Sequence, residues 1–249
     1  MSESPPDPLA MPAPEPNGFV KTLNSMGYMT SSLDPFSRAF VEFAPQAPGR
    51  CLDIGAAYGI ASLAALHNGA AVVANDIDER HLQILSGRTP ASLRDRLTLA
   101  PGNFPDHIDF PAGSFGAVLL CRVMHFFDGP TIERAAEKLR SWLAPGGKAF
   151  VVSETPFLKT ALTFFPTYQA RLKAGDPWPG MVDNVGAHDP KREGTLPRRM
   201  HLLDETILRR VFSHAGFAIE RLQLFARPDF PADLQLDGRE SVGLIARKD

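Results

Sequence analysis

The chain has 249 residues, 44% of them hydrophobic and 22% charged, which is ordinary for a globular protein and excludes a wholly disordered chain. Its 26 basic and 28 acidic residues give a formal net charge of −2, so duplex nucleic acid is a poor partner. No apolar run reaches the roughly 20 residues of a membrane helix, and residues 1–16 lack the blocks of a signal peptide. Two cysteines are too few for a disulfide framework or a thiolate-only zinc site. We therefore expect a soluble, cytoplasmic protein with reduced thiols and no membrane segment.

The first residues are rich in proline, which stands at positions 5, 6, 8, 12, 14 and 16. Proline excludes a regular helix or a central strand there, and the stretch has almost nothing apolar to bury. We therefore expect residues 1–17 to be a disordered tail and residues 18–249 to form a single domain.

From residue 34 onward, helical and extended patterns alternate. Asp34 followed by Pro35 predicts an N-cap and the first turn of a helix. The predicted strands are 51–54, 71–74, 97–99, 117–120 and 149–152, with helices from 61, 78 and 130 between them. A helix over 204–215 and extended runs over 217–225 and 241–246 follow. Apolar strands that alternate with helices predict a doubly wound, mostly parallel α/β sheet with helices on both faces and a ligand site at the carboxyl ends of its strands.

The first of these strands ends in a glycine-bearing turn, Gly55 to Gly59, which allows a ligand to lie against the backbone. A dinucleotide would place its pyrophosphate here, where Asp53 repels it, and its fingerprint requires glycine where Ala57 and Ile60 stand. These residues disfavour a nicotinamide oxidoreductase. A ligand with a cationic amino group, such as S-adenosylmethionine, fits Asp53 better.

Four segments together resemble the class I S-adenosylmethionine-dependent methyltransferase superfamily. They are Leu52-Asp53-Ile54-Gly55-Ala56-Ala57-Tyr58-Gly59, Ala74-Asn75-Asp76-Ile77-Asp78, Ser114–Cys121 with Val123-Met124-His125, and Leu143-Ala144-Pro145-Gly146-Gly147-Lys148. The resemblance covers residues 34–155 and implies a Rossmann-like, seven-stranded sheet whose last strand is antiparallel. It also implies S-adenosylmethionine as the cofactor and S-adenosylhomocysteine as its product.

The resemblance implies roles for single residues along the turn and the strand ends. Gly55 and Cys121 would offer carbonyls to the methionine ammonium, with Asp53 behind them, and Asp76 would hold the ribose. The remaining cofactor residues that it implies are Ala57 and Gly59 in the turn, Ile77 and Phe104 on the two faces of the adenine, and Asn103 at its edge. Ala57 replaces the usual central glycine, and Asn103 stands where aspartate is common.

The methyl acceptor is less specified. Methyltransferases of exocyclic base amines usually carry a Pro-Pro motif after the fourth strand, where this chain has Cys121-Arg122-Val123-Met124. We therefore expect a small-molecule acceptor methylated on O or N, with a protein side chain as an alternative. A catalytically silent member that acts through a protein partner stays open. We expect a monomer or a homodimer.

Two segments would build the acceptor pocket: a flap over residues 18–33 and a lid insert over residues 156–200. Apolar spacing predicts a helix over 157–165. The substrate-binding candidates are Tyr28 in the flap and Tyr168, Arg171 and Trp178 in the insert. Six cations between 188 and 210 indicate either a solvated face or an anionic acceptor.

Methyl transfer needs alignment first, and a base only where the acceptor must lose a proton. The catalytic candidates are His125, Glu154 and His201, with Tyr28 as a further possible base. Each of them has a structural alternative, a hydrogen-bonded side chain with no catalytic role. No pairing of His with Asp or Glu has metal-ligand spacing, so we predict no metal.

Overall fold

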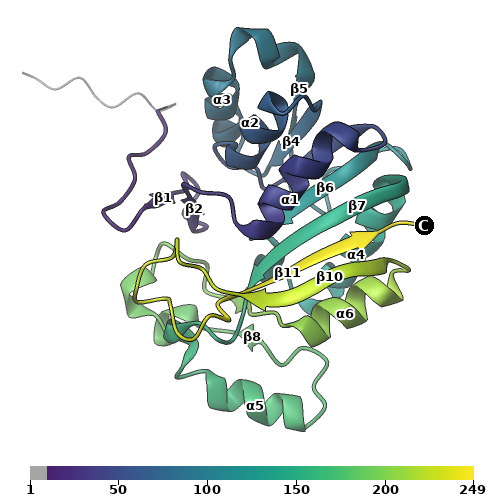
Figure 1. Ribbon diagram of the computed structural model, residues 1–249. Coiled ribbons are helices and arrows are strands. Elements are labelled where there is room, and N and C mark those ends of the chain that lie inside the picture. The colour runs from purple at the N-terminus through teal and green to yellow at the C-terminus, as the bar shows by residue number, and fades with distance from the viewer. Residues whose placement is uncertain (1–9) are drawn as a thin grey trace, which may run out of the picture.

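The computed structural model describes residues 10–249 and has a single central sheet with helices packed on both faces (Figure 1). Residues 1–9 of the expected tail lie outside the described residues, and residues 10–17 form no helix or strand. Within residues 10–249, no helix combines the length and the apolar character needed to cross a bilayer.

The sheet has seven strands in the order β10-β11-β7-β6-β3-β4-β5. Their bounds are β3 Arg50–Ile54, β4 Val72–Asp76, β5 Leu97–Pro101, β6 Phe115–Cys121, β7 Leu143–Glu154, β10 Ala218–Phe225 and β11 Ser241–Arg247. The pairs within β5-β4-β3-β6-β7 are parallel, whereas β11 runs antiparallel to both β7 and β10. The predicted doubly wound sheet with an antiparallel last strand is confirmed.

Helices cover both faces because the inner strands are apolar on both sides. The main helices are α1 Pro35–Phe43, α2 Ile60–His67, α3 Glu79–Arg88, α4 Gly129–Trp142 and α6 Glu205–His214. Along β6, Ala117 and Leu119 pack in the core beneath α1 and α2, while Val118 and Leu120 pack in the core formed with α4 and α6. Figure 1 shows α1 on the face opposite α4 and α6. This arrangement leaves the carboxyl ends of the parallel strands as the open edge of the sheet.

Aspartate caps fix the starts of several helices. Asp34 Oδ1 accepts the backbone N–H groups of Phe36 at 2.8 Å and Ser37 at 3.0 Å, as the sequence predicts for α1. Asp78, Asp128 and Asp204 cap α3, α4 and α6 in the same way. The 3-10 helices span Ala44–Gln46, Ala91–Arg96, Met124–Phe126, Lys159–Ala161, Val185–Ala187 and Pro190–Arg192.

Two segments lie off the sheet. The flap contains an antiparallel hairpin of β1 (Phe19–Lys21) and β2 (Tyr28–Thr30). The insert contains α5 (Phe165–Lys173) and the antiparallel pair of β8 (Met181–Val182) and β9 (Met200–His201). The chain leaves the sheet after Glu154 and returns at Leu203, whose N–H donates to the Glu154 carbonyl at 2.9 Å.

The predicted helix over 157–165 is wrong, because the helix of the insert begins only at Phe165. Before it, Leu158, Ala161 and Phe164 enter one apolar cluster, and their spacing of three residues suits the 3-10 turn found there. The N–H of Lys159 also donates to a distant residue, the Leu234 carbonyl, at 3.0 Å, instead of to a carbonyl within a helix.

Candidate active site

A cavity of about 260 Å³ lies at the carboxyl ends of β3, β4, β6 and β7. Its walls come from the strand ends, the flap, the insert and the loop between β10 and β11, residues 226–240, which we call the C-terminal loop. Segments that are distant in sequence therefore line one shared cavity. We call the part lined by the turn after β3 and the ends of β4 and β5 the cofactor half, and the rest the acceptor half.

Asp53 lies at the end of β3 and is 3% exposed. Its Oδ2 accepts a hydrogen bond of 2.6 Å from the Ser62 hydroxyl on α2. Burial raises the pKa of Asp53 to about 6; the Ser62 hydrogen bond opposes this rise and the negative charge of Asp76 adds to it. A cationic ligand group beside this carboxylate would relieve the cost of its burial, so the site favours such a ligand.

Asp76 ends β4 and accepts three hydrogen bonds. Its Oδ2 accepts from the N–H of Ala57 at 2.9 Å, and its Oδ1 accepts from the N–H of Asp78 at 2.9 Å and lies 3.0 Å from His81 Nδ1. Ala57 has a φ of +46°, a left-handed conformation that costs a non-glycine residue about 1 kcal/mol. The bond to Asp76 holds it there, which explains how alanine replaces the expected glycine.

The two glycines of the turn have steric reasons to be glycine. Gly55 has a φ of +70°, and a Cβ on it would lie 2.3 Å from Val123 Cγ2. Gly59 has a φ of +81°, and its Cβ would lie 2.1 Å from Leu85 Cδ1. Gly55 lines the cavity, whereas Gly59 is absent from its lining and shapes the start of α2.

The residues expected around the adenine also line the cavity. Ile77 is 54% exposed, which leaves a face of its side chain open to a ligand. Phe104 is mostly buried, with its ring centroid 5.7 Å from that of Trp142 and 6.0 Å from that of Phe127, and Asn103 lies beside it. Cys121 lines the cavity too, and burial raises the pKa of its thiol, which holds it protonated.

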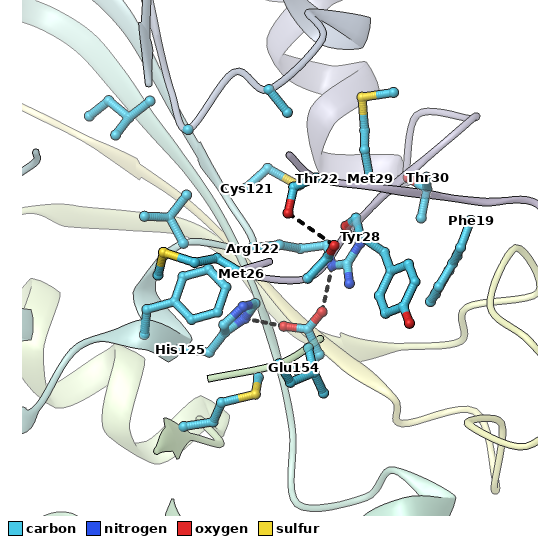
Figure 2. Close-up of a pocket in the computed structure, with 18 of the residues that line it drawn as sticks. Phe19, Thr22, Met26, Tyr28, Met29, Thr30, Cys121, Arg122, His125 and Glu154 are labelled. Carbon is cyan, nitrogen blue, oxygen red and sulfur yellow. Dashed lines mark hydrogen bonds and ion pairs between the residues drawn. The ribbon is translucent and has the colours of Figure 1, made fainter. Parts of the chain in front are cut away.

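The acceptor half contains a group of three interacting polar residues, Arg122, His125 and Glu154, shown in Figure 2. Glu154, at the end of β7, lies between Arg122 and His125 and contacts both, through Arg122 Nε and His125 Nδ1. Burial raises the pKa of Glu154, but its interactions with His125 and Arg122 outweigh this effect and hold that pKa well below its usual range. Glu154 is therefore ionised and orients the imidazole of His125 towards the cavity boundary that both residues line.

Arg122 also ties this group to the flap. Its Nη1 donates to the carbonyl of Tyr28 at 2.9 Å, and its guanidinium lies 5.7 Å from the ring centroid of Phe19 and 5.2 Å from that of Phe230. Its backbone has a φ of +60°, a conformation that is held by a hydrogen bond of 2.8 Å from the Arg122 N–H to the Val152 carbonyl. No role was predicted for Arg122 from the sequence. The one feature that could have indicated a role is its position next to Cys121 at the end of a strand.

Besides Gly59, four of the expected site residues do not line the cavity: Tyr168, Arg171, Trp178 and His201. The Tyr168 hydroxyl donates to the capping Asp204, and Arg171 Nη1 donates to the Met181 carbonyl at 2.6 Å. Each of these contacts fixes the insert, so the structure separates these side chains from Tyr28, His125 and Glu154.

Trp178 and His201 pack on each other, with ring centroids 5.2 Å apart. Burial lowers the pKa of His201 to about 4, and its Nδ1 lies 3.2 Å from the Phe127 carbonyl. Arg210, one of the six cations noted in the sequence, stacks on Trp178 with 4.4 Å from its guanidinium carbon to the ring centroid. These contacts belong to the base of the insert.

Other lining residues carried no sequence signal. Phe230 and Leu234 reach the cavity from the C-terminal loop, where the sequence indicated only a long connection. Arg192 lines the cavity from the insert and is buried, paired with Asp189 at 2.9 Å and with Asp233 at 3.0 Å. The insert and the C-terminal loop are thus joined beside the cavity.

Comparison with known families and structures agrees with this geometry. The sequence profile of a family described as a methyltransferase domain matches residues 29–222. The chain belongs to this methyltransferase family. The resemblance to class I S-adenosylmethionine-dependent methyltransferases is thereby confirmed. The sequence matches none of the curated proteins with which it was compared.

Solved structures share the fold at low sequence identity. An S-adenosylmethionine-dependent methyltransferase from Mesorhizobium loti is 18% identical, with a TM-score of 0.60 over 85% of this chain and 96% of that one. One from Methanosarcina mazei is 19% identical, with a TM-score of 0.62 over 87% and 98%. The Burkholderia thailandensis 1,6-didemethyltoxoflavin-N1-methyltransferase, solved with 1,6-didemethyltoxoflavin and S-adenosylhomocysteine, is 17% identical, with a TM-score of 0.59 over 86% and 78%.

Proposed function

We propose that this protein transfers the methyl group of S-adenosylmethionine to an oxygen or nitrogen atom of a small, mostly apolar molecule. The observation that carries the proposal is the single cavity that joins two buried carboxylates, Asp53 and Asp76, to an apolar space bordered by His125 and Glu154. The cytoplasmic location and the monomeric or homodimeric state stay predictions of the sequence.

The cofactor half fits the cofactor of this family. The buried carboxylate of Asp53 suits a cationic amino acid group, and Gly55 lines the cavity beside it. Three donors already orient the Asp76 carboxylate and leave one lone pair free on Oδ2, so it would accept a ribose hydroxyl. Ile77 and Asn103 would hold the adenine by its face and its edge.

When bound, S-adenosylmethionine supplies a methyl group on a positively charged sulfur, which a nucleophile attacks in line. The chain's contribution is to align the acceptor and to exclude water with the flap and the insert. His125 presents its Nδ1 to Glu154, which leaves Nε2 to receive a proton from an acceptor O–H or N–H. The ionised Glu154 would stabilise the resulting imidazolium.

The acceptor half favours an uncharged acceptor. The two arginines that line it, Arg122 and Arg192, are both paired with carboxylates. An anionic acceptor would have to compete with those carboxylates, which argues against the anionic alternative. Aromatic and sulfur-containing side chains make up much of the remaining wall: Phe19, Met26, Tyr28, Met29, Phe126, Phe164, Met200 and Phe230. Such a wall suits a planar, apolar acceptor.

Calorimetry with S-adenosylhomocysteine, followed by transfer assays with labelled S-adenosylmethionine, tests the proposal. We expect micromolar binding that Asp53→Asn weakens, and label transfer to members of a panel of phenols and heteroaromatic N–H compounds. Absence of binding by the wild type would reject the cofactor assignment. Binding without transfer to this panel or to a metabolite extract would instead support the catalytically silent alternative, and label on protein would support side-chain methylation.

A further inference from the structure

A hydrogen-bonded chain connects the flap to the cofactor half through His81, in the first turns of α3. The backbone N–H of Leu23 lies 3.0 Å from His81 Nε2, and His81 Nδ1 lies 3.0 Å from Asp76 Oδ1. His81 is 1% exposed, so water does not compete for either contact. A single imidazole ring therefore bridges the flap backbone and the carboxylate assigned to the ribose.

The backbone donor fixes the protonation pattern of this ring. A peptide N–H can only donate, so Nε2 of His81 must accept and carries no proton. The ring proton is then on Nδ1 and points at Asp76, which accepts it. Each group in the chain from Leu23 through His81 to Asp76 has one role, and loss of the Leu23 bond would release the orientation of the imidazole.

The rest of the flap repeats the same connection. The Tyr58 hydroxyl donates to the Lys21 carbonyl at 2.7 Å, and Arg80 Nη2 donates to the Leu23 carbonyl at 3.2 Å. Tyr58 belongs to the glycine turn and Arg80 to α3, so these polar ties from Lys21 to Leu23 end on elements that form the cofactor half.

The other strand of the flap hairpin faces the acceptor. Tyr28 and Met29 line the cavity, and the Tyr28 carbonyl accepts the Arg122 hydrogen bond. The flap is thus anchored on the cofactor half and forms a wall of the acceptor half. A change in its anchoring would be felt where the acceptor binds.

We propose that His81 is a positioning residue that couples occupation of the cofactor half to placement of the flap. A ribose hydroxyl bound to Asp76 and the flap N–H bound to His81 stabilise one arrangement of the Asp76–His81 pair. Coupling of this kind is reciprocal, so the cofactor orders the flap and the flap strengthens cofactor binding. The inference rests on the proposed function in one respect, because it takes Asp76 as the ribose ligand.

A proline substitution in the flap isolates the decisive hydrogen bond. Ser25 N–H lies 3.4 Å from the Thr22 carbonyl, so Leu23 occupies the second position of a turn, where proline is favoured. Leu23→Pro removes the N–H donor, and Leu23→Ala removes the same apolar side chain while it keeps the donor. We expect Leu23→Pro to bind S-adenosylhomocysteine about fivefold more weakly than Leu23→Ala, the factor that corresponds to one hydrogen bond.

Amide hydrogen exchange of residues 19–30 in the full-length protein supplies a readout that a purely structural role would not move. We expect S-adenosylhomocysteine to slow exchange across the flap in the wild type and in Leu23→Ala, and to have little effect in Leu23→Pro and His81→Phe. His81→Gln, which keeps one donor and one acceptor, should recover part of the protection.

Kinetics give a second, independent readout. Once an acceptor is known, we expect the loosened flap of Leu23→Pro to raise the acceptor KM severalfold and to change kcat less. Equal binding and equal flap protection in the two Leu23 variants would overturn the coupling, even if His81→Phe fails to fold. A wild type that does not bind S-adenosylhomocysteine would instead overturn the proposed function, so the two failures are distinguishable.

Discussion

The two halves of the cavity are built in different ways. The cofactor half comes from strand ends and the turns that follow them, so its residues fall in short runs of sequence: Asp53 to Ala57, Asn75 to Ile77 with His81, and Gly102 to Phe104. The acceptor half is assembled from the flap, the insert, the C-terminal loop and the end of β7, which are far apart in sequence. The cofactor half is therefore specified by short stretches of sequence, whereas the acceptor half is specified by tertiary contacts between distant segments.

Substitution of His125 gives the largest expected effect and acts on the acceptor half alone. His125→Ala should lower kcat about 100- to 10,000-fold, the usual range for removal of a general base. The dissociation constant for S-adenosylhomocysteine should stay within about twofold of the wild-type value, because His125 lies in the acceptor half and not in the cofactor half. Steady-state kinetics and calorimetry measure the two quantities.

The matched control for this variant is His188→Gln. His188 lines the same cavity, but its Nδ1 lies 2.7 Å from the Thr163 hydroxyl and has no carboxylate behind it. Its kcat should remain near that of the wild type. Full turnover by His125→Ala would remove His125 from the mechanism, and loss of cofactor binding in that variant would break the separation of the two halves.

Substitution of Asp76 reverses the pattern. Asp76→Ala removes the carboxylate that would accept a ribose hydroxyl, and one hydrogen bond to a charged group corresponds to a loss of about 10- to 150-fold in affinity. Asp78→Ala is the control, because Asp78 caps α3 but does not line the cavity. It should lower the melting temperature and keep the affinity. Calorimetry that finds similar affinities for both variants would contradict the ribose assignment.

The pH dependence of cofactor binding is the smallest expected effect and concerns Asp53. Since its pKa is raised to about 6, the carboxyl is mostly protonated at pH 5 and cannot balance a cationic ligand. Affinity for S-adenosylmethionine should therefore rise about fivefold from pH 5 to pH 6 and about tenfold from pH 5 to pH 7, where it levels off. Asp53→Asn should bind weakly with no such rise. An affinity of the wild type that does not change with pH would show that the cationic group of the ligand does not bind beside Asp53.

The same raised pKa has the opposite sign for the unliganded protein. Between pH 3.8, the ordinary pKa of an aspartate, and about pH 6, the unfolded chain has lost the Asp53 proton and the folded chain keeps it. The stabilising contribution of the protonated Asp53 is therefore complete below 3.8 and lost as pH rises through about 6. Thermal unfolding of Asp53→Asn across this window should lack that component.

Most of the sheet and of the cofactor half could be predicted from the sequence because short-range rules apply there. Apolar runs, aspartate caps and glycine turns predicted the seven strands and their order of alternation with the helices. The positions of Asp53, Asp76 and Asn103 at strand ends followed from the parallel sheet. His81 was missed even so, since a histidine in the first turns of a helix gives no sign of what reaches it from another segment.

The acceptor half could not be predicted in the same way because its contacts span long sequence separations. Tyr168 and Trp178 were chosen as aromatic residues in an insert, but neither lines the cavity. Phe19 and Phe230, which do line it, meet across a separation that no local pattern reports, with ring centroids 5.5 Å apart. Packing partners of this kind are fixed by the fold of the whole chain and not by the segment that supplies them.

The hydrogen bond between Leu203 and Glu154 has a consequence for the history and redesign of such a protein. It closes the insert at its base, so the two end points of the insert, at Glu154 and Leu203, keep the same positions on the sheet whatever chain lies between them. The cost of closing a loop grows only slowly with its length, so a shorter or longer excursion fits the same base. The insert is therefore an exchangeable segment. Arg192 joins it to the C-terminal loop through Asp233, so the two would have to be grafted together. Such a graft would transfer acceptor preference between relatives and leave the residues of the cofactor half unchanged.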